Sequence, residues 1–239
     1  LHIGVIAVAD LVSVEDHHLS AADRLQHVGM GDHHAGILAE ADAWFRARGF
    51  KLHYDPGMEA HYFLVSRGQA MGVRLELIKQ DLPNDPRMKD GWTPAYWRDE
   101  HPLGIEGLQA IGVSTPSLDE ARALFAGSFE WPEIGSWYLP GDDADCAAFL
   151  LGDTVIEAMQ GRDPQGAVAT HAREVKGIHN LVFKVKDAQA AAQYLREKGL
   201  SLIGDTAARF AIAPQQVHGR LIYFTQNDVA GYPPLGSQM

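Results

Sequence analysis

Residues 178–226 open with 178-IHNLVFKVKDAQAAAQYLREKG-199 and close with 219-GRLIYFTQ-226. The opening segment begins as an apolar strand and then takes the spacing of an amphipathic helix that stops at Gly199. The closing segment is again strand-like and ends at an apolar edge. This order predicts a unit of one strand, one helix and three short strands.

The same layout occurs twice more, from 108-LQAIGVSTPSLDEARALFAG-127 to 153-DTVIEAMQ-160 and from 33-HHAGILAEADAWFRARGF-50 to 72-GVRLELIKQ-80. Equivalent strand positions have similar separations: 42 residues for His34 to Glu76, 47 for Ala110 to Glu157 and 43 for Asn180 to Tyr223. One such unit cannot bury its own sheet face. The repeat therefore predicts an α+β protein of tandem βαβββ modules. These pair face to face into curved mixed sheets, with a cleft between them and helices on the outer face.

The repeat also divides the chain. Residues 1–80 are predicted to be an N-terminal module pair whose first module is abbreviated or incomplete, because the strand 1-LHIGVIAVADL-11 is followed by too few residues before the next copy. Residues 81–104 contain four prolines and no hydrophobic period, which favours a linker. Residues 105–228 form the C-terminal module pair and 229–239 a tail. Because the chain starts at Leu1, we expect it to be trimmed, processed or incomplete there.

The composition limits the class of protein and its partners. With 239 residues, 46% of them hydrophobic and 21% charged, the chain has enough apolar material for a core. Its formal net charge of −11 argues against nucleic acid, whose binding needs clustered basic residues. The sequence has neither an apolar run that spans a bilayer nor a signal-peptide pattern. We therefore expect a cytoplasmic protein with a small-molecule partner and no membrane partner. Because paired modules can come from one chain or from two, both a monomer and a homodimer stay open.

Cys146 is the only cysteine, so no intrachain disulfide forms and a reducing compartment is favoured. Its neighbours in 142-DDADCAAF-149 are acidic, and acidic neighbours raise the pKa of a thiol. We therefore expect Cys146 to be a structural residue and not a nucleophile.

Side-chain alternation along the first strand of a copy indicates which residues face the cleft. In 108-LQAIGV-113, it directs Ile111 and Val113 toward the helix and leaves Ala110 on the cleft side. In 179-HNLVFKV-185, it directs Asn180 into the cleft and His179 away from it. The cleft-side residues are the candidates for a binding site.

The segments 177-GIHNLVFKVKD-187 and 214-PQQVHGRLIYF-224, with the helix between them, resemble the second half of an epimerase-type module of the vicinal oxygen chelate superfamily. This superfamily includes glyoxalase I, methylmalonyl-CoA epimerase, extradiol ring-cleaving dioxygenases and the fosfomycin and bleomycin resistance proteins. The resemblance extends from His33 to the C-terminus. It is specific for the fold and weak for the reaction.

The resemblance implies a metal held by a His on the first strand and a Glu on the last strand of each paired unit. At these positions the C-terminal half has Ala110, Glu157, Asn180 and Tyr223, of which only Glu157 is a competent ligand. We therefore expect no metal in the C-terminal half. Glu157 is then either a ligand for a polar molecule or the partner of a basic residue.

In the N-terminal half, the resemblance points to His34 and Glu76, with His2 on the opening strand as a third ligand. Two imidazoles and one carboxylate form the facial triad of non-haem iron and related metals, so the implied cofactor is a divalent Fe, Mn or Zn ion. Without the resemblance, His34 and Glu76 are interpreted as a strand-end histidine and a solvated glutamate. The other histidines before residue 34 lack helical metal-site spacing and indicate a solvated segment.

The leading functional hypothesis is a metal-dependent enzyme, a lyase, isomerase or oxidoreductase, that acts on a small organic molecule with vicinal oxygens. The metal acts there as a Lewis acid. A ring-cleaving dioxygenase is the favoured subclass by analogy. Candidate proton carriers are His61 and Tyr62. Candidate substrate-binding residues are Arg74, Glu157, Asn180 and Tyr223. The alternative is a metal-free protein of the same fold that binds a small molecule or sequesters an antibiotic, and a third interpretation is a dimerising scaffold without chemistry.

Overall fold

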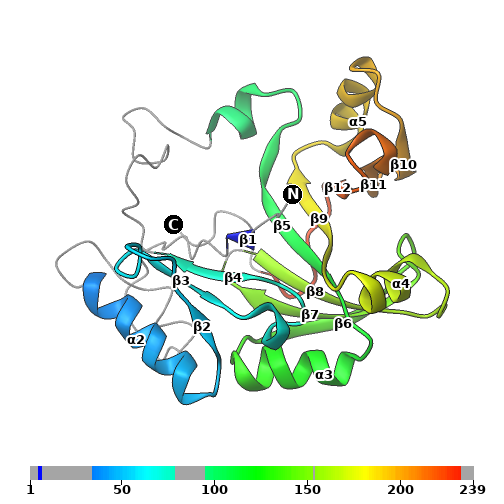
Figure 1. The fold of residues 1–239 in the computed structure, drawn as a ribbon. Helices are drawn as coiled ribbons and strands as arrows, with labels where there is room; N and C mark the ends of the chain where they lie inside the picture. Colours follow the sequence, from blue (N-terminus) through cyan, green and yellow to red (C-terminus); the bar gives the residue numbers. More distant parts are fainter. Residues whose placement is uncertain (1–4, 7–33, 79–94, 153, 233–239) are drawn as a thin grey trace.

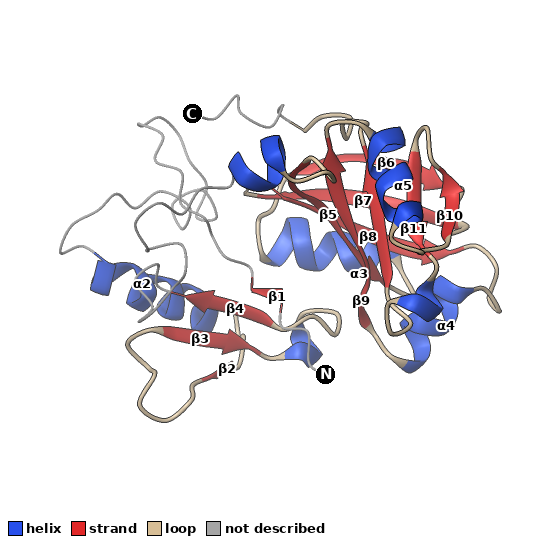
Figure 2. Cartoon of the chain, turned by 90° about the horizontal axis from the view of Figure 1, so that it is seen from above, coloured by secondary structure: helices blue, strands red, loops and turns tan. Residues whose placement is uncertain are grey.

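The computed structural model describes residues 5–6, 34–78, 95–152 and 154–232 of the chain. Within these ranges the strands form two sheets, a four-stranded sheet in the N-terminal part and an eight-stranded mixed sheet in the C-terminal part (Figure 1). Seen from above, the two sheets lie beside each other (Figure 2). The predicted α+β class of tandem βαβββ modules is confirmed for the C-terminal part.

The larger sheet starts with one βαβββ module. Strand β5 (Ile105–Ser114) is followed by helix α3 (Leu118–Arg122), which continues as the π-helical segment η4 (Ala123–Ser128). Strands β6 (Glu133–Leu139), β7 (Ala144–Leu151) and β8 (Thr154–Gly161) complete the module. The Ser117 hydroxyl caps α3 by accepting a hydrogen bond from the backbone N–H of Glu120 at 3.2 Å, as the Ser-x-x-Glu pattern predicts. The first strand of the module, β5, runs parallel to its last strand, β8.

The second module repeats this plan after the connecting helix α4 (Ala167–Glu174). It consists of β9 (Gly177–Val185), α5 (Ala188–Glu197), β10 (Leu202–Asp205), β11 (Arg209–Ile212), the short η5 (Pro214–Gln216) and β12 (Leu221–Thr225). Asp187 caps α5, and Gly199 follows the helix with φ +79°, a conformation that glycine adopts without strain. Again the first strand, β9, is parallel to the last, β12.

The two C-terminal modules join edge to edge. Strands β5 and β9 pair antiparallel, which gives one sheet in the order β10-β11-β12-β9-β5-β8-β7-β6. The predicted arrangement of two sheets face to face is therefore wrong for this half, and its inner surface is one side of a single curled sheet. The reason is that β5 and β9, of 10 and 9 residues, each have a free edge in their own module, and pairing them satisfies both edges.

The N-terminal sheet is built from residues 5–78. Its elements are β1 (Val5–Ile6), α2 (His34–Ala47), β2 (Leu52–His53), β3 (Tyr62–Val65), the short η1 (Arg67–Gln69) and β4 (Leu75–Ile78). The strand order is β1-β4-β3-β2, and β1 pairs parallel with β4. The two C-terminal modules have the same parallel pairing between their first and last strands.

The strand predicted at His34 is wrong, because His34 is the first residue of helix α2. The helical period of Ala41 and Phe45, both buried, extends toward the N-terminus and includes this segment. The strand that pairs in parallel with β4 is instead β1, where Ile6 lies beside Glu76.

The two sheets share one hydrophobic core. Phe45 and Phe50 of the N-terminal part pack on Phe129 of the C-terminal part, with ring centroids 5.9 Å and 5.0 Å apart. Beside them, Arg48 and Glu130 form an ion pair at 2.6 Å. The predicted direction of β5 is confirmed, because Ile111 and Val113 belong to this core.

The predicted boundaries at residues 80, 105 and 229 stay a prediction, since residues 79–94 and 233–239 lie outside the described part of the chain. Within the predicted linker, Tyr96–Glu100 form a π-helical turn, η3. None of the described helices has both the length and the apolar character needed to cross a lipid bilayer.

Candidate functional site

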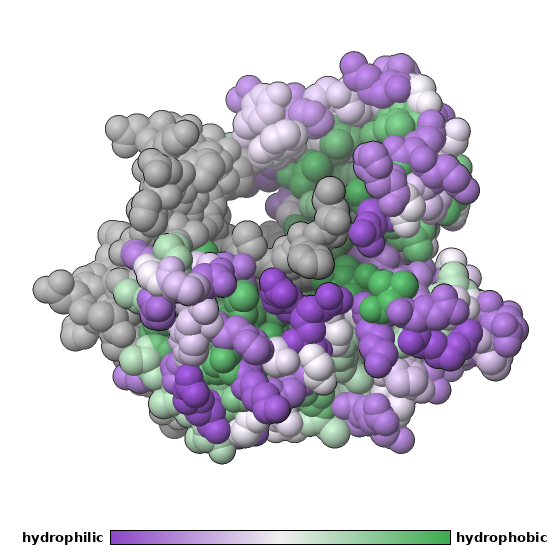
Figure 3. All heavy atoms as spheres, viewed as in Figure 1, coloured by the Kyte–Doolittle hydropathy of each residue, from purple (hydrophilic) through white to green (hydrophobic). Residues whose placement is uncertain are grey.

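A pocket of about 420 Å³ lies between the four-stranded sheet and strands β9 and β12. Its lining comes from β3 and β4 on one side and from the starts of β9 and β12 on the other. At the centre of the face shown in Figure 3, hydrophilic and hydrophobic surfaces meet in this region. The pocket thus joins segments that are far apart in the sequence.

Side-chain alternation divides β3 and β4 between the core and the pocket. Phe63 and Leu75 are buried in the core beneath α2. Tyr62, Arg74 and Glu76, on the opposite face, line the pocket. Two polar-apolar alternating strands therefore place a phenol, a guanidinium and a carboxylate together on one wall.

The other wall contains a β-bulge at His179. The register of β9 on β5 shifts between Asn180 and Ile178, so His179 is an extra residue in the strand. The bulge breaks the alternation that directs His179 away from the cleft. His179 lines the pocket next to Asn180, and its Nε2 atom lies 3.9 Å from the carboxylate of Asp142. The predicted direction of Asn180 is confirmed and that of His179 is wrong.

The two walls touch at Gly72 and Gly177, both with φ +84°. A Cβ atom on Gly177 would lie 2.6 Å from the carbonyl oxygen of Gly72, so only glycine permits this approach. The preceding residue, Lys176, also has a positive φ of 64°, and its backbone N–H donates to the carbonyl of His171 at 2.8 Å. This contact fixes one end of the pocket and the position of Lys176.

Glu76 is the titratable group of the pocket with the most suitable environment for proton transfer. Burial and then the negative charge of Asp55 raise the pKa of Glu76, while Arg74 opposes the shift. The Tyr62 hydroxyl donates a hydrogen bond to the carboxylate of Asp55, and this bond raises the pKa of Tyr62. A carboxyl group whose pKa is moved toward neutrality both accepts and releases protons readily.

Glu157 and Tyr223 lie in a separate, buried cluster on the inner side of the eight-stranded sheet. Glu157 is 3% exposed, and Arg209 donates to its carboxylate at 3.4 Å. Arg209 also lies 3.7 Å from the carboxylate of Asp142 and 4.4 Å over the ring of Tyr223. The Tyr223 hydroxyl donates to Asp142 at 3.0 Å. Arg209 is thus the basic partner predicted for a buried Glu157.

Burial sets the protonation behaviour of this cluster. It raises the pKa of Glu157 against the opposing charge of Arg209. Burial also raises the pKa of Cys146, which is 1% exposed and therefore a poor nucleophile. The predicted structural role of Cys146 agrees with both findings.

The predicted site residues fall into three groups. Those that line the pocket are Tyr62, Arg74, Glu76 and Asn180. Glu157 and Tyr223 are in the buried cluster. His61 precedes β3, does not line the pocket, and has a buried Nδ1 atom without a hydrogen-bond partner among the described residues.

The metal triad of His2, His34 and Glu76 stays a prediction. His2 lies outside the described residues, and so does the side chain of His34. Among the side chains that are described, no group of three His, Cys, Asp or Glu residues is close enough to hold a metal ion. The pocket offers the carboxylates of Glu76 and Asp55, and Asp55 already accepts the Tyr62 hydroxyl. The described residues therefore do not by themselves fit the metal that the superfamily implies.

Sequence reasoning missed Asp55, Lys176 and Arg220, which also line the pocket. Lys176 and Arg220 each stand directly before a strand, and these strands are parallel neighbours. Parallel strands begin at the same edge of a sheet, so a basic residue before each start is a signal that points to one place.

Several solved structures are similar to about half of the chain. Methylmalonyl-CoA epimerase from Mycobacterium tuberculosis is 21% identical over 51% of this chain and 87% of its own, with a TM-score of 0.47. A variant of the same enzyme from Streptomyces coelicolor, in complex with 2-nitronate-propionyl-CoA, is 16% identical over 54% and 99%, with a TM-score of 0.48. A hypothetical protein from Bacillus halodurans is 21% identical over 52% and 95%, with a TM-score of 0.46.

No curated protein matches the chain. The family described as Glyoxalase/Bleomycin resistance protein/Dioxygenase superfamily matches residues 109–224, which cover both C-terminal modules from β5 to β12. The two βαβββ modules joined along β5 and β9 agree with that match. Through these residues, just under half of the chain, this protein is similar to the glyoxalase/bleomycin resistance protein/dioxygenase superfamily.

Proposed function

We propose that this protein is an enzyme that acts on a small organic molecule with neighbouring oxygens, bound in the pocket between the two sheets. The observation that carries the proposal is Glu76, a half-buried carboxylate with a raised pKa that lines this pocket beside Tyr62 and Arg74. A concave site with a few convergent polar groups and a perturbed titratable residue is typical of enzymes.

The reaction that these groups support is proton abstraction next to a carbonyl group. Glu76 takes a proton from carbon, and the electron pair of the broken C–H bond moves onto the carbonyl oxygen. Arg74, on the same face of β4, stabilises the negative charge on that oxygen. Return of the proton to the same or a neighbouring carbon gives an isomerase, and loss of a leaving group gives a lyase.

A divalent metal is part of the proposal through Glu76. Members of the superfamily commonly bind such ions, and a bound ion supplies Lewis acidity to substrate oxygens. The parallel pairing sets Ile6 beside Glu76, and His2 lies four residues before Ile6 in the chain, which supports a ligand role for Glu76 together with His2. The pairing gives no support for His34, which begins helix α2. The ring-cleaving dioxygenase expected by analogy is an alternative to the isomerase or lyase and would require such a metal. Metal analysis of the full chain, beside Glu76→Gln, tests this: a metal content near zero in both proteins contradicts it.

The second candidate is a metal-free binding protein. It is favoured by the C-terminal half, where Ala110, Asn180 and Tyr223 occupy positions at which the superfamily implies metal ligands. In this case the pocket holds its ligand without changing it. The two candidates are distinguished by turnover of the bound compound, which only the enzyme would show.

Two substitutions at exposed apolar residues test where small molecules bind. Val175 lines the pocket and is 56% exposed, and Ile203 is 42% exposed on β10 outside the pocket. We expect oxo acids, hydroxy acids and catechols detected by ligand-observed NMR to bind wild type and Ile203→Trp equally. Val175→Trp, which fills the pocket entrance, should weaken that binding at least about tenfold, or about 1.4 kcal/mol. Equal binding to Val175→Trp overturns the proposed site.

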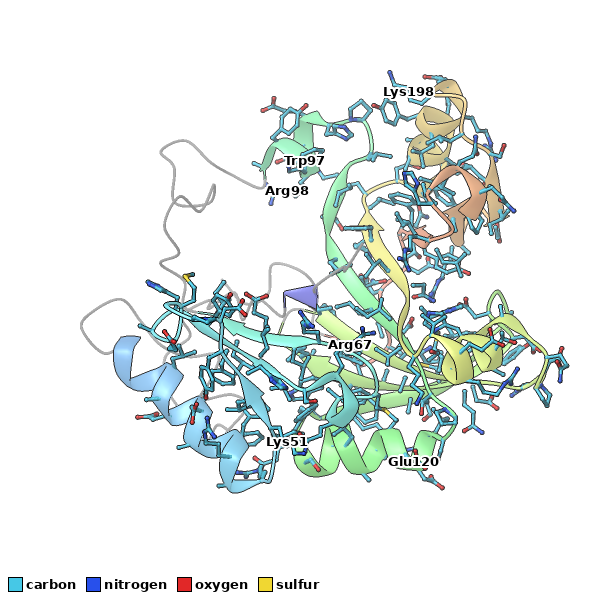
Figure 4. All side chains as sticks on the ribbon, viewed as in Figure 1. Lys51, Arg67, Trp97, Arg98, Glu120 and Lys198 are labelled. Atoms are coloured by element: carbon cyan, nitrogen blue, oxygen red, sulfur yellow. The ribbon has the colours of Figure 1, made fainter. Side chains whose placement is uncertain are left out.

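The chemistry is tested with the compounds that bind. In D₂O, wild type should exchange the C–H proton next to the carbonyl of its ligand, and Glu76→Gln should slow this exchange by about 10²-fold or more while still binding. Glu120→Gln is the control, because Glu120 is exposed on α3 at the outside of the molecule (Figure 4). Binding without exchange in wild type supports the binding protein instead.

A further inference from the structure

The pocket is basic in an acidic protein. Its charged lining residues, apart from the histidine, are Arg67, Arg74, Lys176 and Arg220, against Asp55 and Glu76. This leaves an excess of two positive charges in a chain whose formal net charge is −11. A cleft lined by one sign of charge concentrates small ions of the opposite sign.

Three of these basic side chains have no carboxylate partner among the described residues. Arg67 is held within its own sheet, where its Nε atom donates to the Gly72 carbonyl at 2.9 Å. Within the described part of the chain, Arg74, Lys176 and Arg220 form no ion pair with a carboxylate, although Arg74 acts on Glu76 through its charge. Elsewhere in the described structure, arginines such as Arg122 and Arg162 are paired with acidic side chains.

The topology brings two of the three cations to one edge. Lys176 precedes β9 and Arg220 precedes β12, and these strands are parallel with Leu221 opposite Asn180. The positive φ of Lys176 and the close contact of Gly72 with Gly177 hold this edge against the N-terminal sheet, which supplies Arg74. In Figure 4, Arg67 lies at the centre, between the two sheets.

The wall between these cations also holds polar atoms without partners. Asn180 is 1% exposed, and its Oδ1 atom has no hydrogen-bond partner among the described residues. Its Nδ2 atom has only the sulfur of Met159, at 3.6 Å. The Nε2 atom of His179 likewise lacks a hydrogen-bond partner in the described structure. Buried polar groups in native proteins are nearly always bonded, so unpaired ones at a pocket wall are a feature of a ligand-binding surface.

We infer that the pocket takes an organic anion, whose carboxylate or phosphate group is bound by Lys176 and Arg220, while Arg74 stays with the reacting part of the molecule. The inference rests on the proposed function and names the class of its substrate. The anionic group lies at the Lys176–Arg220 edge, and the reacting part of the molecule extends toward Glu76 and Tyr62. An anion is held there by charge-assisted contacts from two cations.

The test uses inorganic phosphate and succinate as separate probes of the full chain, followed by backbone amide NMR. We expect saturable shifts of the amides around Gly177, Asn180 and Leu221. Lys176→Gln and Arg220→Gln should each weaken the apparent Kd about tenfold, because each removes one charge-assisted contact. Lys176→Arg should retain binding. Lys51→Gln removes the same charge at an exposed site outside the pocket and should leave the Kd unchanged (Figure 4).

The outcomes separate this inference from the proposed function. Saturation by phosphate alone identifies a phosphate ester as the ligand class, and saturation by succinate alone identifies a carboxylic acid. Lack of saturation by both probes, or equal weakening by Lys51→Gln, overturns the inference. If neither anion saturates the protein but Val175→Trp still weakens the binding of neutral compounds, the inference fails and the proposed site stands. If both anions bind as described but Val175→Trp binds every tested compound as tightly as wild type, the anion site stands and the proposed function fails.

Discussion

At the scale of single residues, the positive charge of Arg209 offsets the energetic cost of burying two carboxylates. The side chains of Glu157 and Asp142 are each 3% exposed, and Arg209 lies 3.4 Å and 3.7 Å from them. We expect Arg209→Met to lower the free energy of unfolding by about 3–5 kcal/mol, because it leaves both carboxylates without a counter-charge. Adding Glu157→Gln should restore part of this loss. Urea denaturation measures both values.

The control for this prediction is Arg196→Met, at an exposed arginine of helix α5. It removes the same charge and the same hydrogen-bond donors from a solvated position, where we expect a change within about 0.5 kcal/mol. A loss for Arg209→Met no larger than that for Arg196→Met would contradict the role of Arg209.

At the scale of elements, helix α5 depends on the residue before it. The Asp187 carboxylate accepts hydrogen bonds from the backbone N–H groups of Gln189 and Ala190, both at 2.9 Å. We expect Asp187→Ala to lower the free energy of unfolding by about 1 kcal/mol. Asp187→Asn should lose much less, since its amide oxygen accepts the same bonds. Thermal and urea unfolding of the two variants measure the difference, and equal losses would show that the cap is not the cause.

Also at this scale, the ends of helices could be predicted, because they depend on residues that are close in the sequence. The caps at Ser117 and Asp187 and the stops at Gly49 and Gly199 are short-range signals, and the structure has them at those positions. The bulge at His179 was not predictable from the strand, because it arises from the pairing of β9 with β5. Register shifts of this kind depend on a partner strand that is distant in the sequence.

At the scale of the whole molecule, the contact of Gly72 with Gly177 holds the two sheets together at the pocket. We expect Gly177→Ala to destabilise the protein more than Gly199→Ala, by about 1–3 kcal/mol, which is the range for overpacking. Both residues have a positive φ, +84° and +79°, so both substitutions introduce the same backbone strain. Only the Cβ at residue 177 meets another chain segment, the Gly72 carbonyl, whereas residue 199 has open space around it.

The measurement is urea unfolding of both variants, together with the binding of small anions. Gly177→Ala should also weaken binding, because the two walls of the pocket move apart, whereas Gly199→Ala should bind like wild type. Equal unfolding free energies and equal affinities for the two variants would show that the sheets do not depend on this approach.

The sequence by itself determined the βαβββ plan of the C-terminal part, together with its helices and caps. It also singled out four residues that line the pocket: Tyr62, Arg74, Glu76 and Asn180. These follow from periodicity and from residues close together in the chain, where local physical preferences are strong. The start of helix α2 at His34 was predicted as a strand because the repeat places a strand at the beginning of each module, although the helical period of Ala41 and Phe45 extends to it.

Only the tertiary structure decided which residues meet. It joined β5 with β9 into one sheet, paired Glu157 with Arg209, and brought Glu76 of the N-terminal sheet across a pocket from Lys176 and Asn180. These contacts link segments separated by many residues, and no local pattern specifies them. The two sheets are held by one shared hydrophobic core, in which Phe45 packs on Phe129. This packing sets the two walls of the pocket opposite each other.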